Sequence, residues 1–168
     1  MFRTMRRKRQ LLGEDEALDM IRRGSHGVLA VVDETGYPYA VPISPVVYDG
    51  RVYFHCAKSG HKLDAIRACE RVSLCVVDRD DVQPATFSTH YRSAILFGRA
   101  RIVEDAAEIL GAMRALAAKY SPNEGEAAFQ HEMSTEAPAL CVVAIEIEHL
   151  SGKQAKGLVK SEQQEENT

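Results

Sequence analysis

The sequence predicts a single, mainly β domain of the α+β class, in which an antiparallel sheet closes, or nearly closes, into a barrel with helices packed outside it. The candidate strands come in hairpin-sized units, and Asp49-Gly50 is the clearest turn between two of them. Strands and helices do not alternate as a parallel sheet requires, and a length of 168 residues favours one domain. Periodicity alone leaves an open α+β sheet and a sandwich as alternatives.

The spacing of apolar residues predicts each element in turn. Helices are expected over residues 14–23, 62–69 and 106–119, with a partly helical segment over 123–138. Strands or extended segments are expected over residues 27–32, 39–48, 51–57, 72–77, 91–103 and 139–147. Pro38, Pro42 and Pro45 confine the second of these to a sheet edge or a bulged strand, because proline lacks the N–H that a ladder needs.

Three other segments complete the pattern. Gly98 interrupts the strand over 91–103 and predicts a bulge or a tight bend there. Residues 78–90 are polar and contain Pro84, which predicts a loop. The last residues, 161–168, are polar and acidic and are expected to form a disordered tail, which leaves one domain over residues 1–160.

Composition limits the functional classes. Hydrophobic residues make up 45% of the chain and charged residues 27%, and the formal net charge of −3 gives no strong electrostatic case for binding nucleic acid. The basic run at residues 6–9 is interpreted as a short solvated arm. The four cysteines form no CxxC pair, which suits a reducing cytosol. No signal peptide or bilayer-spanning stretch is visible, so we expect a cytoplasmic protein that does not bind membranes.

The most informative segment runs from Tyr53 to Ile66. A strand ends there in a polar loop that contains Gly60, and the loop opens a helix with Lys62 in its first turn. Backbone N–H groups and the positive end of the helix attract an anion, and Ser59 and Lys62 add side-chain donors. The segment therefore predicts a phosphate monoester site, although a solvated lysine after an ordinary Ser-Gly turn is the alternative. Neither GxGxxG nor GxxxxGK[ST] occurs, so neither a dinucleotide nor a nucleoside-triphosphate site is supported.

The order of several short motifs resembles a known family. The motifs are Gly36–Ile43, Asp49-Gly50, Tyr53–Ala57, Gly60–Lys62, Tyr91–Gly98 and Leu150–Lys153. Together they are similar to the FMN-binding split barrels of the pyridoxamine 5′-phosphate oxidase-like kind, and most of all to the 5-nitroimidazole antibiotic resistance group. The resemblance extends from Met5 to about Lys153 and implies a six-stranded antiparallel split β-barrel with flanking helices. It also implies a homodimer with FMN at the subunit interface and a small-molecule substrate.

The resemblance further implies which residues contact the isoalloxazine, the ribityl chain and the phosphate of FMN. These residues are Val41, Pro42, Ile43, Ser44, His55, Cys56, Ala57, Ser59, His61, Lys62, Arg92 and Ser93. Arg92 and Ser93 stand where the pyridoxamine phosphate oxidases reach the flavin with Arg and Gln, so Ser93 departs from that pattern. The basic residue that those oxidases use before the first flavin-lining strand is missing as well, which argues against pyridoxamine phosphate as the substrate.

His55 is the candidate catalytic residue. By strict alternation it shares a strand face with Tyr53, opposite Phe54 and Cys56, and beside a flavin it could donate a hydrogen bond or a proton. A histidine whose ring only packs in the barrel is the alternative. No metal is expected, because the His and Cys residues near His55 fit no common zinc spacing.

The resulting functional prediction is an FMN-dependent oxidoreductase that reduces small electron-poor compounds such as nitroimidazoles. Two alternatives stay open. The first is a non-catalytic flavin-binding or flavin-sensing module, and the second is a split barrel that binds haem or the deazaflavin F420.

Overall fold

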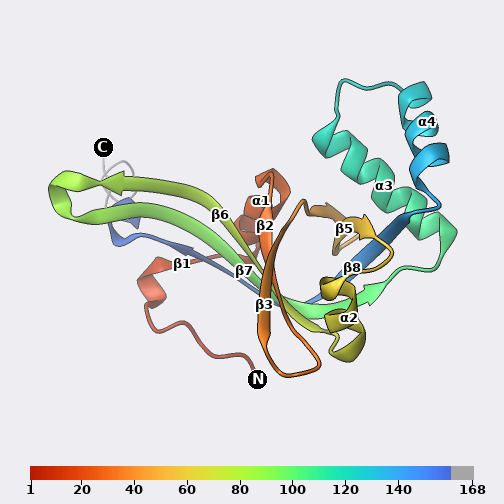
Figure 1. The fold of residues 1–168 in the computed structure, drawn as a ribbon. Coiled ribbons are helices and arrows are strands. Elements are labelled where there is room, and N and C mark those ends of the chain that lie inside the picture. The colour runs from red at the N-terminus through yellow and green to blue at the C-terminus, as the bar shows by residue number, and fades with distance from the viewer. Residues whose placement is uncertain (160–168) are drawn as a thin grey trace.

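Eight strands form one curved antiparallel sheet in the computed structural model, which describes residues 1–159 (Figure 1). The strands are β1 (Leu11–Leu12), β2 (Gly27–Val32), β3 (Pro38–Ile43), β4 (Val46–Tyr48), β5 (Arg51–Ala57), β6 (Arg71–Gln83), β7 (Ser88–Ile102) and β8 (Leu140–Gln154). Their order is β3-β2-β6-β7-β8-β5-β4, and β1 pairs with the end of β8. The mainly β, antiparallel fold predicted from the sequence is confirmed.

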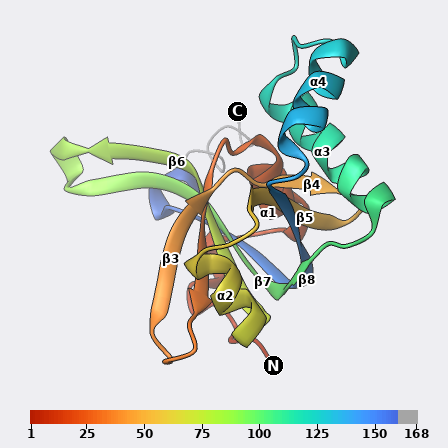
Figure 2. The same ribbon diagram turned by 45° about the vertical axis from the view of Figure 1, so that its right-hand side comes forward.

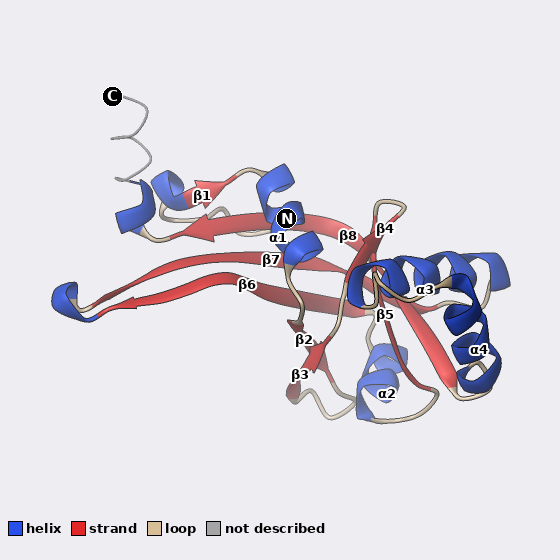
Figure 3. Cartoon of the chain, turned by 90° about the horizontal axis from the view of Figure 1, so that it is seen from above, coloured by secondary structure: helices blue, strands red, loops and turns tan. Residues whose placement is uncertain are grey.

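Four α-helices and two short 3-10 helices accompany the sheet between residues 8 and 136, and residues 156–159 are helical as well. They are η1 (Lys8–Gln10), α1 (Glu14–Arg23), α2 (His61–Ala68), η2 (Pro84–Thr86), α3 (Ala106–Tyr120) and α4 (Glu126–Glu136). Acidic residues open α1 and arginines close it, in accord with the helix dipole. Seen from above, α3 and α4 lie at one end of the molecule, and a two-stranded extension of β6 and β7 projects from the other (Figure 3).

The barrel core lies on the inner face of the sheet. Strand alternation directs Leu29, Leu74 and Leu96 inward, where α1 and α2 cover them with apolar side chains. Full burial of a leucine contributes about 1.5–3 kcal/mol to stability, so these positions carry much of the folding free energy. A second, smaller cluster forms where α3 packs on Tyr53 of β5 and Val142 of β8.

Gly98 lies at the bulge that the sequence predicted. The register between β7 and β8 shifts between Phe97 and Gly98. A Cβ atom on Gly98 would collide with the carbonyl oxygen of Glu146, so the close approach of the two backbones requires glycine.

The predicted loop over residues 78–90 is wrong. Strands β6 and β7 continue through it as a ribbon paired from Arg79–Arg92 to Gln83–Ser88, and η2 closes the ribbon at its tip. The sequence predicted a loop because residues 78–90 are polar and lack the alternation of apolar and polar residues that marks a half-buried strand. A ribbon with solvent on both faces has no such alternation, and cross-strand backbone hydrogen bonds hold it together.

The boundaries of several other strands and helices also differ from the predicted ones. The sheet has eight strands rather than six because residues 39–48 divide at Ser44 and Pro45 into β3 and β4, and because β1 is added. As predicted for its prolines, β3 is an edge strand. Strand β8 continues seven residues beyond the predicted end at Ile147, and α4 occupies part of the ambiguous segment 123–138. The predicted disordered tail, 161–168, lies outside the described residues. Within residues 1–159, no helix is both long and apolar enough to cross a bilayer.

The opposite side of β3, β2, β6, β7 and β8, called here the outer face, is also rich in apolar residues. Directly opposed residues of antiparallel strands share a face, so two rows cross all five strands. One row is Ser151, Ile95, Cys75, Val28 and Pro42, and the other is His149, Phe97, Ser73, Ala30 and Ala40. Val28 is 41% exposed, and Ile95 and Phe97 are each 38% exposed. At one edge, the ring of Phe2 stacks on His149 at 5.0 Å between centroids.

Candidate functional site

A cavity of about 290 Å³ lies where β3 ends, β5 ends and α2 begins. Its lining residues are His26, Pro42, Ile43, Ser44, His55 and Lys62. Five of them were predicted as cofactor-binding residues, and they come from three separate segments of the sequence. The sixth, His26, was missed. It precedes Gly27, which pairs with Ile43, so only the register between β2 and β3 could have revealed it.

The Ser44-Pro45 turn forms the cavity wall at the end of β3. Residue alternation along β3 directs Pro42 outward and Val41 toward the barrel core. The carbonyl oxygen of Pro45 accepts hydrogen bonds from Lys119 Nζ at 2.7 Å and from the Tyr120 hydroxyl at 2.8 Å. Burial lowers the pKa of Lys119, which is the direction expected for an ammonium group withdrawn from water. The end of α3 therefore holds this turn in place.

On β5, His55 lies at the cavity, whereas the three residues that precede it on the strand are buried in the protein interior. Val52 and Phe54 point into the barrel core, as the sequence predicted. Tyr53 shares the face of His55 but is fully buried beneath α3, where its hydroxyl donates to Glu108 Oε1 at 2.8 Å. His55 itself is exposed, so its imidazole is accessible to a ligand.

The start of α2 supplies positive charge. Gly60 adopts φ 131°, a conformation that favours glycine, and its carbonyl oxygen accepts from Leu63 N and Asp64 N at 2.9 and 3.2 Å. The first N–H groups of a helix have no acceptor within the helix and are available to an anion. The Lys62 ammonium lies 5.8 Å from the centroid of the Phe54 ring, which holds the side chain over the strand beside the cavity. This arrangement suits a phosphate.

Other predicted cofactor residues near this segment point elsewhere. The thiol of Cys56 packs on the barrel core opposite Cys141, and burial raises its pKa to about 11, so it stays neutral near pH 7. His61 stacks on Tyr39 at 4.3 Å between ring centroids, with Nε2 3.5 Å from Asp33 Oδ2. The exposed residues Ala57 and Ser59 are near in sequence but do not line the cavity.

Arg92 and Ser93 lie on a different part of the sheet. They belong to β7 at the base of the projecting ribbon, and Arg92 Nε donates to Gln154 Oε1 at 3.1 Å. Ser93 is paired with Lys153 of β8 and Val77 of β6. Within one chain, these two predicted residues do not line the cavity at α2. Figure 2 shows α2 beside β3 and away from the projecting end of β6 and β7.

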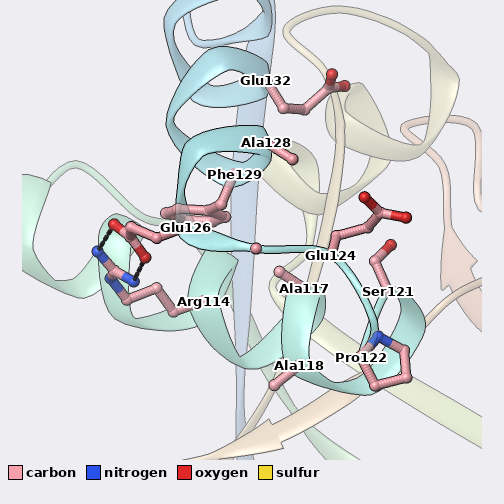
Figure 4. Close-up of a pocket in the computed structure, with 11 residues that line it drawn as sticks. Arg114, Ala117, Ala118, Ser121, Pro122, Glu124, Glu126, Ala128, Phe129 and Glu132 are labelled. Atoms are coloured by element: carbon pink, nitrogen blue, oxygen red, sulfur yellow. Dashed lines mark hydrogen bonds and ion pairs between the residues drawn. The ribbon is translucent and has the colours of Figure 1, made fainter.

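Two larger cavities border α4 and suit a flavin phosphate less well. One of about 590 Å³ between α3 and α4 carries three carboxylates, Glu124, Glu126 and Glu132, and Arg114 is already paired with Glu126 (Figure 4). The other, about 760 Å³, lies between the starts of α3 and β8 and the end of α4. Most of its lining residues are apolar, and of its two basic residues, Lys58 and Arg67, the second is paired with Asp64. In the described part of the chain, no group of three His, Cys, Asp or Glu side chains could hold a metal ion.

The sequence matches the family model described as pyridoxamine 5′-phosphate oxidase over residues 13–154. The chain therefore belongs to this family, as the resemblance predicted. None of the curated proteins matches the sequence.

Solved structures share the fold. A protein of Bacteroides thetaiotaomicron named for 5-nitroimidazole antibiotic resistance aligns with a TM-score of 0.69 and 17% identity, covering 86% of each chain. A conserved hypothetical protein of Mycobacterium tuberculosis aligns with a TM-score of 0.78 and 19% identity over 92% of each chain. An FAD and haem binding protein of Mycobacterium smegmatis aligns with a TM-score of 0.71 and 22% identity, covering 88% of this chain and 74% of that one. At these identities the likeness establishes the split-barrel fold.

Proposed function

We propose that this protein is an FMN-binding oxidoreductase that reduces small electron-poor compounds, such as nitroimidazoles, and that it works as a homodimer. The observation that carries the proposal is the cavity at α2. Pro42 and Ser44 of one segment, His55 of a second and Lys62 of a third converge on it, with a helix N-terminus beside them. The chain belongs to the pyridoxamine 5′-phosphate oxidase family. We propose that, as the resemblance to FMN-binding split barrels implies, this site holds the phosphate of a flavin.

The surroundings of the cavity favour FMN over FAD. A neighbouring hollow beside α2 is lined by Asp33, Glu34 and Asp64, with His61 between them. Asp33 has a lowered pKa because it accepts hydrogen bonds from Thr35 and Tyr37, so it is charged at neutral pH. These carboxylates would repel the second phosphate of FAD, which belongs to its adenosine end, whereas the one phosphate of FMN beside Lys62 avoids them.

We propose that a second copy of the chain enlarges the site, because the cavity of one chain is at the lower end of the sizes that cofactor pockets have. Pockets for small molecules and cofactors commonly measure 300–1,000 Å³, and the cavity at α2 is about 290 Å³. Pro42, which lines it, also belongs to the outer face, whose exposed apolar rows are the kind of surface that marks a protein interface. A two-fold dimer is the commonest way to cover such a face.

In this proposal a bound flavin supplies the electron-transfer chemistry, and the chain binds it, orients it and keeps water from one side. Lys62 and the start of α2 hold the phosphate, and Pro42 and Ser44 form the wall beside it. His55 donates a hydrogen bond from its ring, either to the cofactor or to the substrate. Its exposed position at the end of β5 is compatible with both.

The absorption spectrum of the purified protein, with mass spectrometry of the released ligand, tests the cofactor. We expect FMN at one per subunit after reconstitution. Released FAD, a haem spectrum, a deazaflavin, or no flavin in the presence of excess FMN would overturn the assignment. Turnover of a nitroimidazole with NAD(P)H or dithionite as the electron donor then separates an oxidoreductase from a non-catalytic flavin-binding module.

A further inference from the structure

We propose that Lys153 of one copy lies beside the isoalloxazine of the flavin held by the other copy, where its charge stabilises the reduced ring. This inference rests on the proposed function and deepens it by naming a residue that sets the flavin potential.

The surroundings of Lys153 are unusual for a surface lysine. It lies in a third row across the outer face, between Leu11 of β1 and Ser93 of β7, and Val77 of β6 follows in the same row. Leu11 and Val77 are 48% and 55% exposed, so the lysine is set into apolar surface. Among the described residues, no carboxylate lies within 4 Å of its ammonium group, which instead lies 5.5 Å from the centroid of the Tyr91 ring. A half-buried cation placed in this way is suited to an anionic partner from outside the chain.

Within one chain, Lys153 is far from the cavity at α2. Lys153 is on β8 and Pro42 is on β3, and four strand-to-strand steps separate these strands across the outer face. At about 4.8 Å per step the separation is roughly 19 Å along the sheet. His55, which also lines the cavity, lies on β5 next to β8, but its partner there is Val142, eleven residues from Lys153 and so roughly 36 Å along the strand at about 3.3 Å per residue. Figure 3 shows the same arrangement, with the end of β8 beside β1 and away from α2. The lysine therefore cannot serve the cavity of its own chain.

A two-fold interface brings these two regions together. In such an interface both copies use the same patch. If residue i of the first copy contacts residue j of the second, then residue j of the first copy also contacts residue i of the second. The outer face runs from β3 to β8, with β6 in the middle. A two-fold axis that lies between the two outer faces and runs parallel to β6 would place the β8 end of one copy, with Lys153, over the β3 end of the other, with Pro42 and the cavity.

A positive charge near the flavin ring favours the negative charge that the ring gains on reduction. The test is the midpoint potential of FMN bound to the Lys153→Met protein. We expect reduced FMN to lose at least tenfold in binding relative to oxidised FMN, which lowers the two-electron potential by about 30 mV. Lys153→Arg should restore most of the shift. Lys8→Met, which removes an exposed charge from η1 near β1, is the matched control and should leave the potential unchanged.

Mixed dimers test whether the lysine acts across the interface. When a Lys62→Ala chain pairs with a Lys153→Met chain, a site shared between copies yields one doubly altered site and one intact site. The mixed dimer should then bind one FMN with unaltered affinity and potential. Two singly altered sites would show that Lys153 acts within its own chain and would overturn the proposal.

The outcomes separate the two levels of the argument. If the Lys153→Met protein binds FMN with an unchanged midpoint potential, Lys153 does not lie beside the flavin, and the proposed function is unaffected. Failure of the unaltered protein to bind FMN would overturn the proposed function, and the inference with it.

Discussion

Two neighbouring residues of β7 show how differently the two faces of the sheet are completed. Leu96 points inward and is fully buried among side chains of its own chain, whereas Ile95 points outward and is 38% exposed. Both belong to apolar rows that cross several strands. The inner face is thus completed within one chain, and the outer face is not. The flavin site proposed here lies at the edge of this face, and we propose that a second copy completes both.

The largest effect on folding stability is expected on the inner face. Leu96→Ala removes a buried side chain and leaves a cavity, which costs about 2–5 kcal/mol in the free energy of unfolding. Denaturant unfolding monitored by circular dichroism measures it. A loss below about 1 kcal/mol would mean that the inner face is less tightly packed than the structure indicates.

The matched change on the outer face should affect assembly. Ile95→Asp places an unpaired charge in the proposed interface, and we expect the dimer dissociation constant to rise at least roughly hundredfold, because a buried unpaired charge costs about 3–5 kcal/mol. The altered chain should still fold. Light scattering across a dilution series measures the change, and an unaltered dimer would place the interface on another surface.

The cavity at α2 predicts an effect on cofactor binding. Lys62→Ala removes a charge-assisted contact to phosphate, worth about 1.5–3 kcal/mol, so the affinity for FMN should fall roughly ten- to a hundredfold. Lys58→Ala, an exposed lysine of the same segment that lies outside this cavity, is the control. Equal affinities of the two variants for FMN would mean that Lys62 is a solvated surface residue that does not contact the phosphate.

The smallest effect is expected at His55. As an anchor it donates one hydrogen bond, so His55→Ala should weaken FMN binding by about 0.5–1.5 kcal/mol and leave turnover per bound flavin unchanged. If His55 donates a proton instead, turnover falls by about 10²–10⁴ and the pH profile loses a limb. A lower melting temperature without either change would identify a packing role, which its exposure argues against.

Sequence patterns anticipated most of the fold because burial imposes them. Alternation placed Phe54 inside the barrel and His55 outside, and Gly98 marked the bulge where two backbones approach closely. The ribbon beyond Val77 was missed because a strand exposed on both faces carries no alternation. His26 was missed for a different reason, since it reaches the cavity only through the register of β2 and β3.

Arg92, Ser93 and Lys153 show a limit of reasoning from one chain. The resemblance assigned the first two to the flavin, yet in a single copy all three lie on β7 and β8 and outside the cavity, with Ser93 and Lys153 on the outer face and Arg92 on the opposite one. Neither the sequence nor one chain specifies how the outer face is covered. A site assembled from two copies becomes visible only when both ends of that face are considered together.

Native mass spectrometry of the protein reconstituted with FMN counts the chains and flavins in each particle and so tests whether two copies share the flavin sites. We expect one dominant species with two chains and two FMN molecules, and loss of FMN on conversion to the Ile95→Asp monomer. A monomer that retains FMN with full affinity, or a dimer that binds no flavin, would contradict it.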